Sequence, residues 1–85
     1  MEREYALAVT EFYEYYNKLR EVVHCRMNSH FCEYSDDYLE VWQYEGEKKK
    51  KLLFRINTQK KDNRSVAETY RRATEAVKQL LKEVG

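Results

Sequence analysis

Both histidines and both cysteines of the chain lie within nine consecutive positions. They are His24, Cys25, His30 and Cys32. Imidazole and thiolate groups are the usual ligands of structural zinc, but such sites combine two close ligand pairs from separate segments. A second pair is lacking because the chain has no other His or Cys. We therefore expect no metal and no cofactor, and we interpret the cysteines as small apolar residues. A Cys25–Cys32 disulfide is the alternative, and it requires an oxidising compartment.

A cysteine beside a histidine also suggests a catalytic nucleophile. Nucleophilic catalysis needs a third group that orients the base and an oxyanion hole, and nothing in the sequence marks either one. A glycine-rich phosphate loop is missing too, since Gly46 and Gly85 are the only glycines. We expect a protein without enzymatic activity.

Charge is divided unevenly along the chain. Residues 1–47 carry eleven acidic and four basic side chains, a net charge of −7, whereas residues 48–85 carry twelve basic and four acidic ones, a net charge of +8. Such halves either attract each other within the fold or attract a partner. The acidic surface that we expect consists of Glu33, Asp36, Asp37, Glu40, Glu45 and Glu47. Small charge-polarised domains of this kind resemble phage-encoded inhibitors, including anti-CRISPR proteins. The leading hypothesis is therefore protein–protein binding that occludes a nucleic-acid-handling partner.

Basic and aromatic side chains give the alternative hypothesis, which is RNA binding. Cations neutralise phosphates, and aromatic rings stack on unpaired bases. The candidate basic residues are Lys48, Lys49, Lys50, Lys51, Arg55, Lys60, Lys61 and Arg64. The candidate aromatic face consists of Tyr38, Trp42 and Tyr44. The acidic first half and a pI of only 7.7 count against this alternative.

Two segments with helical periodicity must position these groups. Apolar residues recur at spacings of three and four over residues 2–24 and again from Val66 to Val84, which predicts two amphipathic helices. Ser65 followed by Glu68 forms a capping box at the start of the second helix.

Between the helices, the apolar period changes to two, as expected for strands. Alternation predicts strands over residues 38–44 and 51–57, joined by a hairpin turn at Gly46, and a shorter strand over residues 30–34. The residues expected to face the helices are Leu39, Val41, Leu52, Phe54 and Ile56. The residues expected on the opposite face are Tyr38, Trp42, Tyr44, Lys51 and Arg55. The prediction is one α+β domain over residues 1–85, with α-β-β-β-α order, a three-stranded antiparallel meander and both helices packed on one face.

The stretch EGEKKKKLLFRINTQKKDN, followed by a helix, resembles the basic final strand, loop and helix of the small RNA-binding subunits of the signal recognition particle Alu domain. The element order also resembles that of double-stranded RNA-binding domains. The glycine-and-lysine loop of the latter is replaced here by residues 57–64. Each resemblance implies an RNA partner.

Location and assembly follow from length and composition. No apolar run approaches the ~20 residues that span a membrane, and the start MEREYALAV lacks the order of a signal peptide, so we expect a cytoplasmic protein with no membrane partner. A domain of 85 residues with an aromatic outer sheet face has surface left to bury. We predict a homodimer with Trp42 at the contact.

Overall fold

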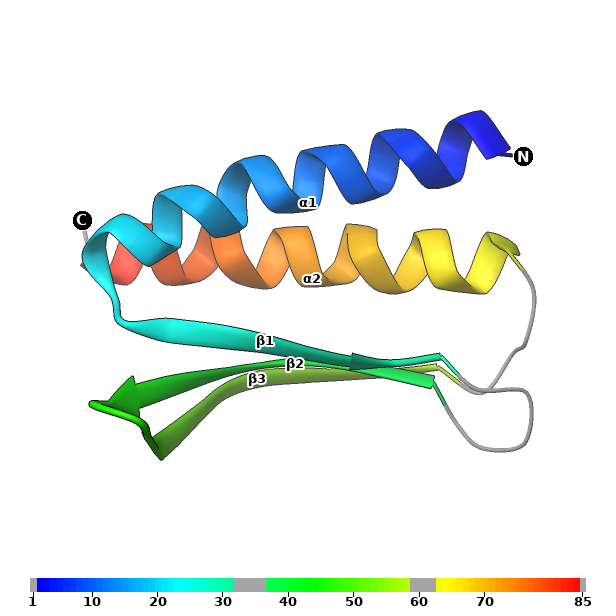
Figure 1. Ribbon diagram of the computed structural model, residues 1–85. Helices are drawn as coiled ribbons and strands as arrows, with labels where there is room; N and C mark the ends of the chain where they lie inside the picture. The colour runs from blue at the N-terminus through cyan, green and yellow to red at the C-terminus, as the bar shows by residue number, and fades with distance from the viewer. Residues whose placement is uncertain (1, 32–36, 59–62, 85) are drawn as a thin grey trace.

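The computed structural model describes residues 2–31, 37–58 and 63–84, and the side chains of residues 3–31, 37–58 and 66–84. Helix α1 (Glu2–Val22) is followed by strands β1 (Cys25–His30), β2 (Asp37–Glu45) and β3 (Lys48–Thr58), and then by helix α2 (Asn63–Val84). The strands form one antiparallel sheet in the order β1-β2-β3, with both helices on one face (Figure 1). The predicted α-β-β-β-α order and α+β class are confirmed.

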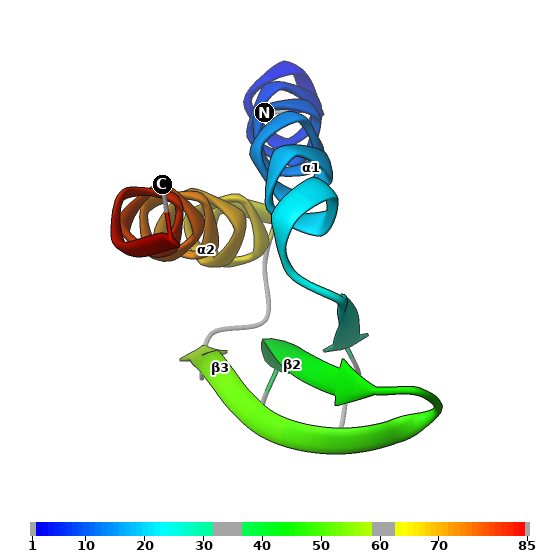
Figure 2. The same cartoon turned by 90° about the vertical axis from the view of Figure 1, so that its left-hand side faces the viewer.

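The two helices cover the sheet unequally. Helix α2 packs against β2 and β3, whereas α1 packs mainly on α2, and its backbone comes close to the sheet only at β1 among the described residues. Figure 2 shows α1 raised above the β1 side of the sheet and α2 beside it on the β3 side. The side of α1 that faces β1 is therefore only partly covered.

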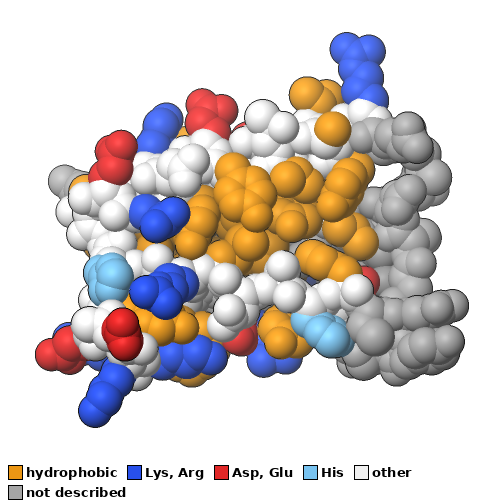
Figure 3. All heavy atoms as spheres, viewed as in Figure 1, with side chains coloured by type: hydrophobic (Ala, Val, Ile, Leu, Met, Phe, Trp, Pro, Cys, Tyr) orange, Lys and Arg blue, Asp and Glu red, His pale blue; other side chains and the backbone are white. Residues whose placement is uncertain are grey.

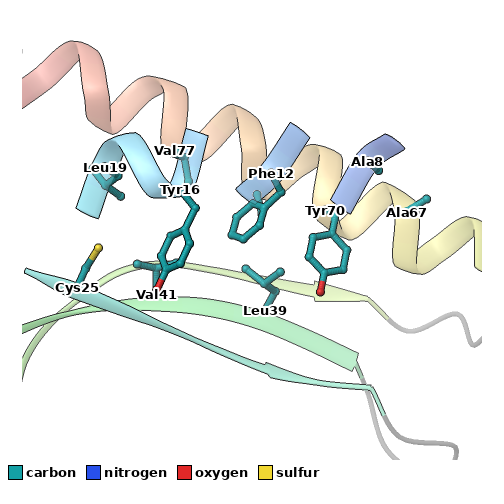
Figure 4. Packing of buried hydrophobic residues seen from close by; sticks show 11 residues of the cluster. Ala8, Phe12, Tyr16, Leu19, Cys25, Leu39, Val41, Ala67, Tyr70 and Val77 are labelled. Atoms are coloured by element: carbon teal, nitrogen blue, oxygen red, sulfur yellow. The ribbon is translucent and has the colours of Figure 1, made fainter. Parts of the chain in front are cut away.

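The core lies where the apolar stripes of the helices meet the inner face of the sheet. Phe12 and Val77 from the helices and Leu39 and Val41 from β2 are fully buried. Figure 4 shows the helix side chains pointing down onto those of the strand. The Phe12 ring also lies 5.5 Å, centre to centre, from the ring of Tyr70, in edge-to-face contact. The central parts of the two predicted helical stripes are buried, whereas Tyr5 and Val84 at their ends are exposed; the inward positions of Leu39 and Val41 are confirmed.

The first strand differs from its prediction. It runs over Cys25–His30 rather than residues 30–34, and residues 32–34 lie outside the described part of the chain. Cys25 pairs with Gln43 and His30 with Tyr38. In its sequence CRMNSH, only Cys25 and Met27 pack against the core, and this single apolar pair is too short an alternation to indicate a strand. This segment is a strand because it pairs with β2, and the spacing of apolar residues along the chain does not indicate it.

The inward alternation of β3 is interrupted by an irregularity in its pairing with β2. Val41 pairs with Phe54, but Trp42 pairs with Leu52, so Leu53 is the extra residue of a β-bulge. Leu53 packs against the core, and Leu52 is 39% exposed on the Trp42 side. The prediction that Leu52 faces the helices is wrong. The prediction that Lys51 lies on the outer face is also wrong. Lys51 pairs with Gln43, and Gln43 follows Trp42 on β2 and therefore points to the opposite face.

The hairpin turn at Gly46 agrees with its prediction, whereas the start of α2 differs from it. Gly46 takes a φ of 64° in the hairpin turn, as expected for a residue without a Cβ. Helix α2 begins at Asn63, two residues before the capping box, and the side chain of Ser65 lies outside the description. Neither helix, over the residues described, is long and apolar enough to cross a membrane.

Candidate binding surface on the outer face of the sheet

The candidate surface is the face of the sheet that points away from the helices. Because Leu39 and Val41 point into the core, their neighbours along β2 point outward. Tyr38, Trp42 and Tyr44 therefore form a row along the central strand, which we call the aromatic row. Their shared face is the one that the sequence predicts.

Each ring of the aromatic row is contacted by a basic side chain from a neighbouring strand. Arg55 Cζ lies 4.2 Å from the centre of the Tyr38 ring. Lys49 Nζ lies 4.9 Å from the Trp42 ring, and Arg26 Cζ lies 5.0 Å from the Tyr44 ring. These distances are those of cation–π contacts. The outer face thus combines apolar rings with positive charge at fixed positions.

An ion pair between a buried carboxylate and a partly exposed guanidinium lies within this surface, next to Tyr38. Glu40 is only 7% exposed, and Arg55 donates from Nη1 to Glu40 Oε2 at 3.3 Å. Arg55 also donates from Nε to Asn57 Oδ1 at 3.0 Å. The guanidinium is therefore held by two hydrogen bonds in addition to its contact with the ring. Sequence reasoning missed the role of Glu40, because it depends on the register between β2 and β3, and it missed the contact of Asn57 with Arg55 two residues earlier on the same strand.

Trp42 carries an unsatisfied donor. Its indole Nε1 is buried and has no hydrogen-bond partner among the described residues. Buried donors without partners are rare and costly in proteins. An acceptor that reached this nitrogen would gain a hydrogen bond that the described chain does not supply.

The hairpin beside the aromatic row adds further positive charge. Lys48, Lys49, Lys50 and Lys51 are all exposed at the start of β3. The ion pair of Lys50 with Glu45 spans 3.9 Å between exposed groups, so it holds little energy. Of the other basic candidates, Lys60, Lys61 and the side chain of Arg64 lie outside the description.

The expected acidic surface is wrong at two of its positions. Asp37 is 3% exposed and Glu40 is 7% exposed, so neither carboxylate is presented to a partner. The carboxylate of Glu40 is not accessible to a partner, because it lies against the sheet and is paired with Arg55. Glu45 and Glu47 are exposed at the hairpin, and Glu33 and Asp36 lie outside the described residues.

The histidines and the described cysteine have separate environments. His24 Nε2 donates to Gly46 O at 3.0 Å, whereas His30, at the other end of β1, stacks on Tyr38 with ring centres 5.4 Å apart. Cys25 is a buried free thiol, and burial raises its pKa, so it stays protonated at neutral pH. Cys32 lies outside the description, and within the described ranges no three metal-binding side chains gather.

A second surface, which sequence reasoning did not assemble, lies between α1 and β1. Tyr5, Tyr13 and Phe31 are each 38% exposed there, and we call them the apolar patch. Tyr5 and Phe31 both contact the ring of Tyr70. Figure 3 shows a continuous area of hydrophobic side chains between the helix and the edge strand. In the sequence, Tyr13 and Tyr15 lie beside the apolar stripe of the first helix and widen it, which is the signal that could have indicated this patch.

Comparison of the chain with protein families, with curated proteins and with solved structures finds no match.

Proposed function

We propose that the protein is a binding module without catalytic activity, and that the outer face of its sheet binds single-stranded RNA. One observation carries this proposal. Each ring of the aromatic row on the central strand is contacted by a basic side chain from an adjacent strand. Rings that stack bases, next to cations that neutralise phosphates, are the two components of single-strand recognition.

The cation–π contacts supply a mechanism for exchange. Lys49 and Arg26 are exposed to solvent although each contacts a ring of the aromatic row, and their side chains are long and flexible. When a phosphate draws such a cation away, the face of the ring that it covered becomes available to a base. The cost of the lost contact is about 0.5–2 kcal/mol, comparable to or smaller than the ~1–3 kcal/mol gained from stacking a base.

The burial of two carboxylates is the reason for preferring RNA over an acidic docking surface. With Asp37 and Glu40 buried, the described acidic groups of the proposed inhibitor surface reduce to Glu45 and Glu47. The hairpin that bears them carries more lysines than glutamates. The residues that the structure describes therefore do not give this face the negative potential that binding into a nucleic-acid groove requires.

The proposal is tested by fluorescence anisotropy with a labelled single-stranded RNA of about ten nucleotides. Binding should weaken steeply between about 50 and 200 mM salt. The double variant Arg26→Gln/Lys49→Gln should bind more weakly and lower the salt slope by about 1.4, since each lost phosphate contact removes about 0.7. The matched control is Arg71→Gln/Arg72→Gln on the exposed side of α2, which should bind like the wild type. Absence of binding at low salt, or equal losses in both double variants, would contradict the proposal.

Protein binding is the second candidate, and the apolar patch is the observation that favours it. An exposed aromatic cluster of this kind is a common feature of protein interaction sites. In this account, the chain would act as a phage-type inhibitor that docks through the patch onto a nucleic-acid-handling protein. Affinity capture from the native host should then retain a partner on the wild type and lose it on Tyr13→Ser/Phe31→Ser. The same variant should keep its RNA affinity, because the two surfaces lie on different sides of β1.

A further inference from the structure

We infer that Arg55 is a stacking platform for one nucleobase, so that the ligand is recognised by a fixed guanidinium plane as well as by rings. This inference rests on the RNA-binding function proposed above. It concerns the end of the outer face where β2 begins and β3 ends, around Tyr38.

The position of the Arg55 guanidinium is fixed by three contacts. Its Cζ lies 4.2 Å from the centre of the Tyr38 ring, its Nη1 donates to the buried Glu40, and its Nε donates to Asn57. The side chain of Arg55 is nevertheless 44% exposed. One part of the group is thus anchored to the sheet while the rest remains open to solvent. A preorganised group loses little conformational entropy on binding.

Tyr38 itself is less accessible to a base than Arg55. Its ring is contacted by the guanidinium of Arg55 and also by the imidazole of His30, which is nearly parallel to it at an interplanar angle of 17°. A base that approaches this end of the aromatic row therefore meets the guanidinium or the imidazole before the tyrosine ring. Guanidinium groups are planar and stack on bases as aromatic rings do.

Arg55 differs from the other cations on the outer face because its charge is paired with a carboxylate. The buried carboxylate of Glu40 offsets the charge of Arg55. Lys49 and Arg26 contact no carboxylate among the described residues, and they retain their full charge for phosphates. We therefore assign base stacking to Arg55 and phosphate neutralisation to Lys49 and Arg26.

The test uses Arg55→Lys, which keeps the charge beside Glu40 but removes the plane. Two probes are compared: a uridine oligomer of about ten nucleotides and an oligomer of the same length whose sugar–phosphate chain carries no bases. Arg55→Lys should weaken binding of the uridine oligomer about tenfold, with an unchanged salt slope, because the variant loses a stacking contact and keeps its charge. It should leave the affinity for the baseless oligomer unchanged, and an unchanged circular dichroism spectrum and melting temperature should show that the variant is folded. The matched control, Arg72→Lys on α2, should change neither affinity.

Three outcomes would overturn the inference, and they are distinguishable. Equal losses on both probes would make Arg55 a phosphate contact. Wild-type affinity of Arg55→Lys for the uridine oligomer would remove the stacking role while the proposed function stands. If the wild type bound neither probe at low salt, the proposed function would fall together with the inference.

Discussion

Tyr70 is the residue at which both helices and the end of β1 meet. Its ring contacts those of Tyr5 and Phe12 on α1 and of Phe31 after β1, and its side chain is buried in the core. Burial, followed by the nearby phenols of Tyr13 and Tyr5, raises the pKa of Tyr70 to about 12. The phenol must therefore stay protonated for the packing to persist.

The raised pKa of Tyr70 makes the stability of the fold depend on alkaline pH. In the unfolded chain a tyrosine ionises near pH 10, so the folded state holds more protons between about pH 10 and 12. The contribution of Tyr70 to stability is complete below about pH 10 and is lost as the pH rises toward 12, by up to roughly 3 kcal/mol. Urea unfolding at about pH 9 and pH 11 measures the loss. Tyr70→Phe should lose less than the wild type over this interval, because its ring cannot ionise.

Tyr44→Phe, on the other face of the sheet, is the control for the pH experiment and should show the wild-type loss. Part of the loss should survive in Tyr70→Phe, since burial also raises the pKa of Tyr16. A Tyr70→Phe protein that lost as much stability as the wild type would show that this phenol is not the group responsible.

At the scale of elements, the bulge in β3 decides which leucine belongs to the core. Leu53 packs against the buried cluster, whereas Leu52 is 39% exposed. Leu53→Ala should therefore cost about 2 kcal/mol or more, as expected for truncation of a core residue, and Leu52→Ala should cost less than about 1 kcal/mol. Chemical denaturation of both variants measures the difference. A larger loss in Leu52→Ala would restore the uninterrupted alternation and refute the register.

Local periodicity was sufficient for some elements and insufficient for others. The helices and the hairpin at Gly46 were predictable, because apolar spacing and a flexible turn residue are properties of short segments. Strand β1 and the bulge at Leu53 were not, because both depend on pairing with β2. The same distinction holds for the candidate site. Alternation placed Tyr38 on the outer face, but only cross-strand register buries Glu40 beside Arg55.

At the scale of the whole molecule, the two oppositely charged halves are joined by ion pairs. Glu11 of α1 pairs with Lys78 of α2 at 3.6 Å, and Glu40 pairs with Arg55 at 3.3 Å. Each pair links the acidic first half to the basic second half. Part of the charge division therefore serves the fold itself, and the exposed lysines of the hairpin, together with Arg26 on β1, are the charge available to a ligand on the outer face.

The predicted homodimer would bury apolar surfaces that this fold leaves exposed in the monomer. The aromatic row is half-buried in the monomer, and the apolar patch is also exposed, so a second copy would bury surface that a domain of this size otherwise leaves in water. Light scattering of the protein without RNA at micromolar concentration should give twice the chain mass of 10.4 kDa, and Trp42→Ala should shift the protein toward monomer. Because this contact and the RNA would share the aromatic row, adding the oligomer should separate the two copies. A mass of one chain throughout would refute the dimer. A dimer that survives Trp42→Ala but is lost in Tyr13→Ser/Phe31→Ser would place the contact at the apolar patch.

The central claim is that the outer face of the sheet binds RNA, and NMR titration of the isotope-labelled protein with a single-stranded oligomer tests it most directly. The chain has one tryptophan, so the indole N–H of Trp42 gives a single side-chain signal from the middle of the aromatic row. We predict that this signal shifts together with the amides of β2 and β3 around Tyr38, Tyr44 and Arg55, while the amides of α1 near Tyr13 stay in place. Shifts confined to α1 and the apolar patch, or an indole signal that does not move at saturation, would contradict the account.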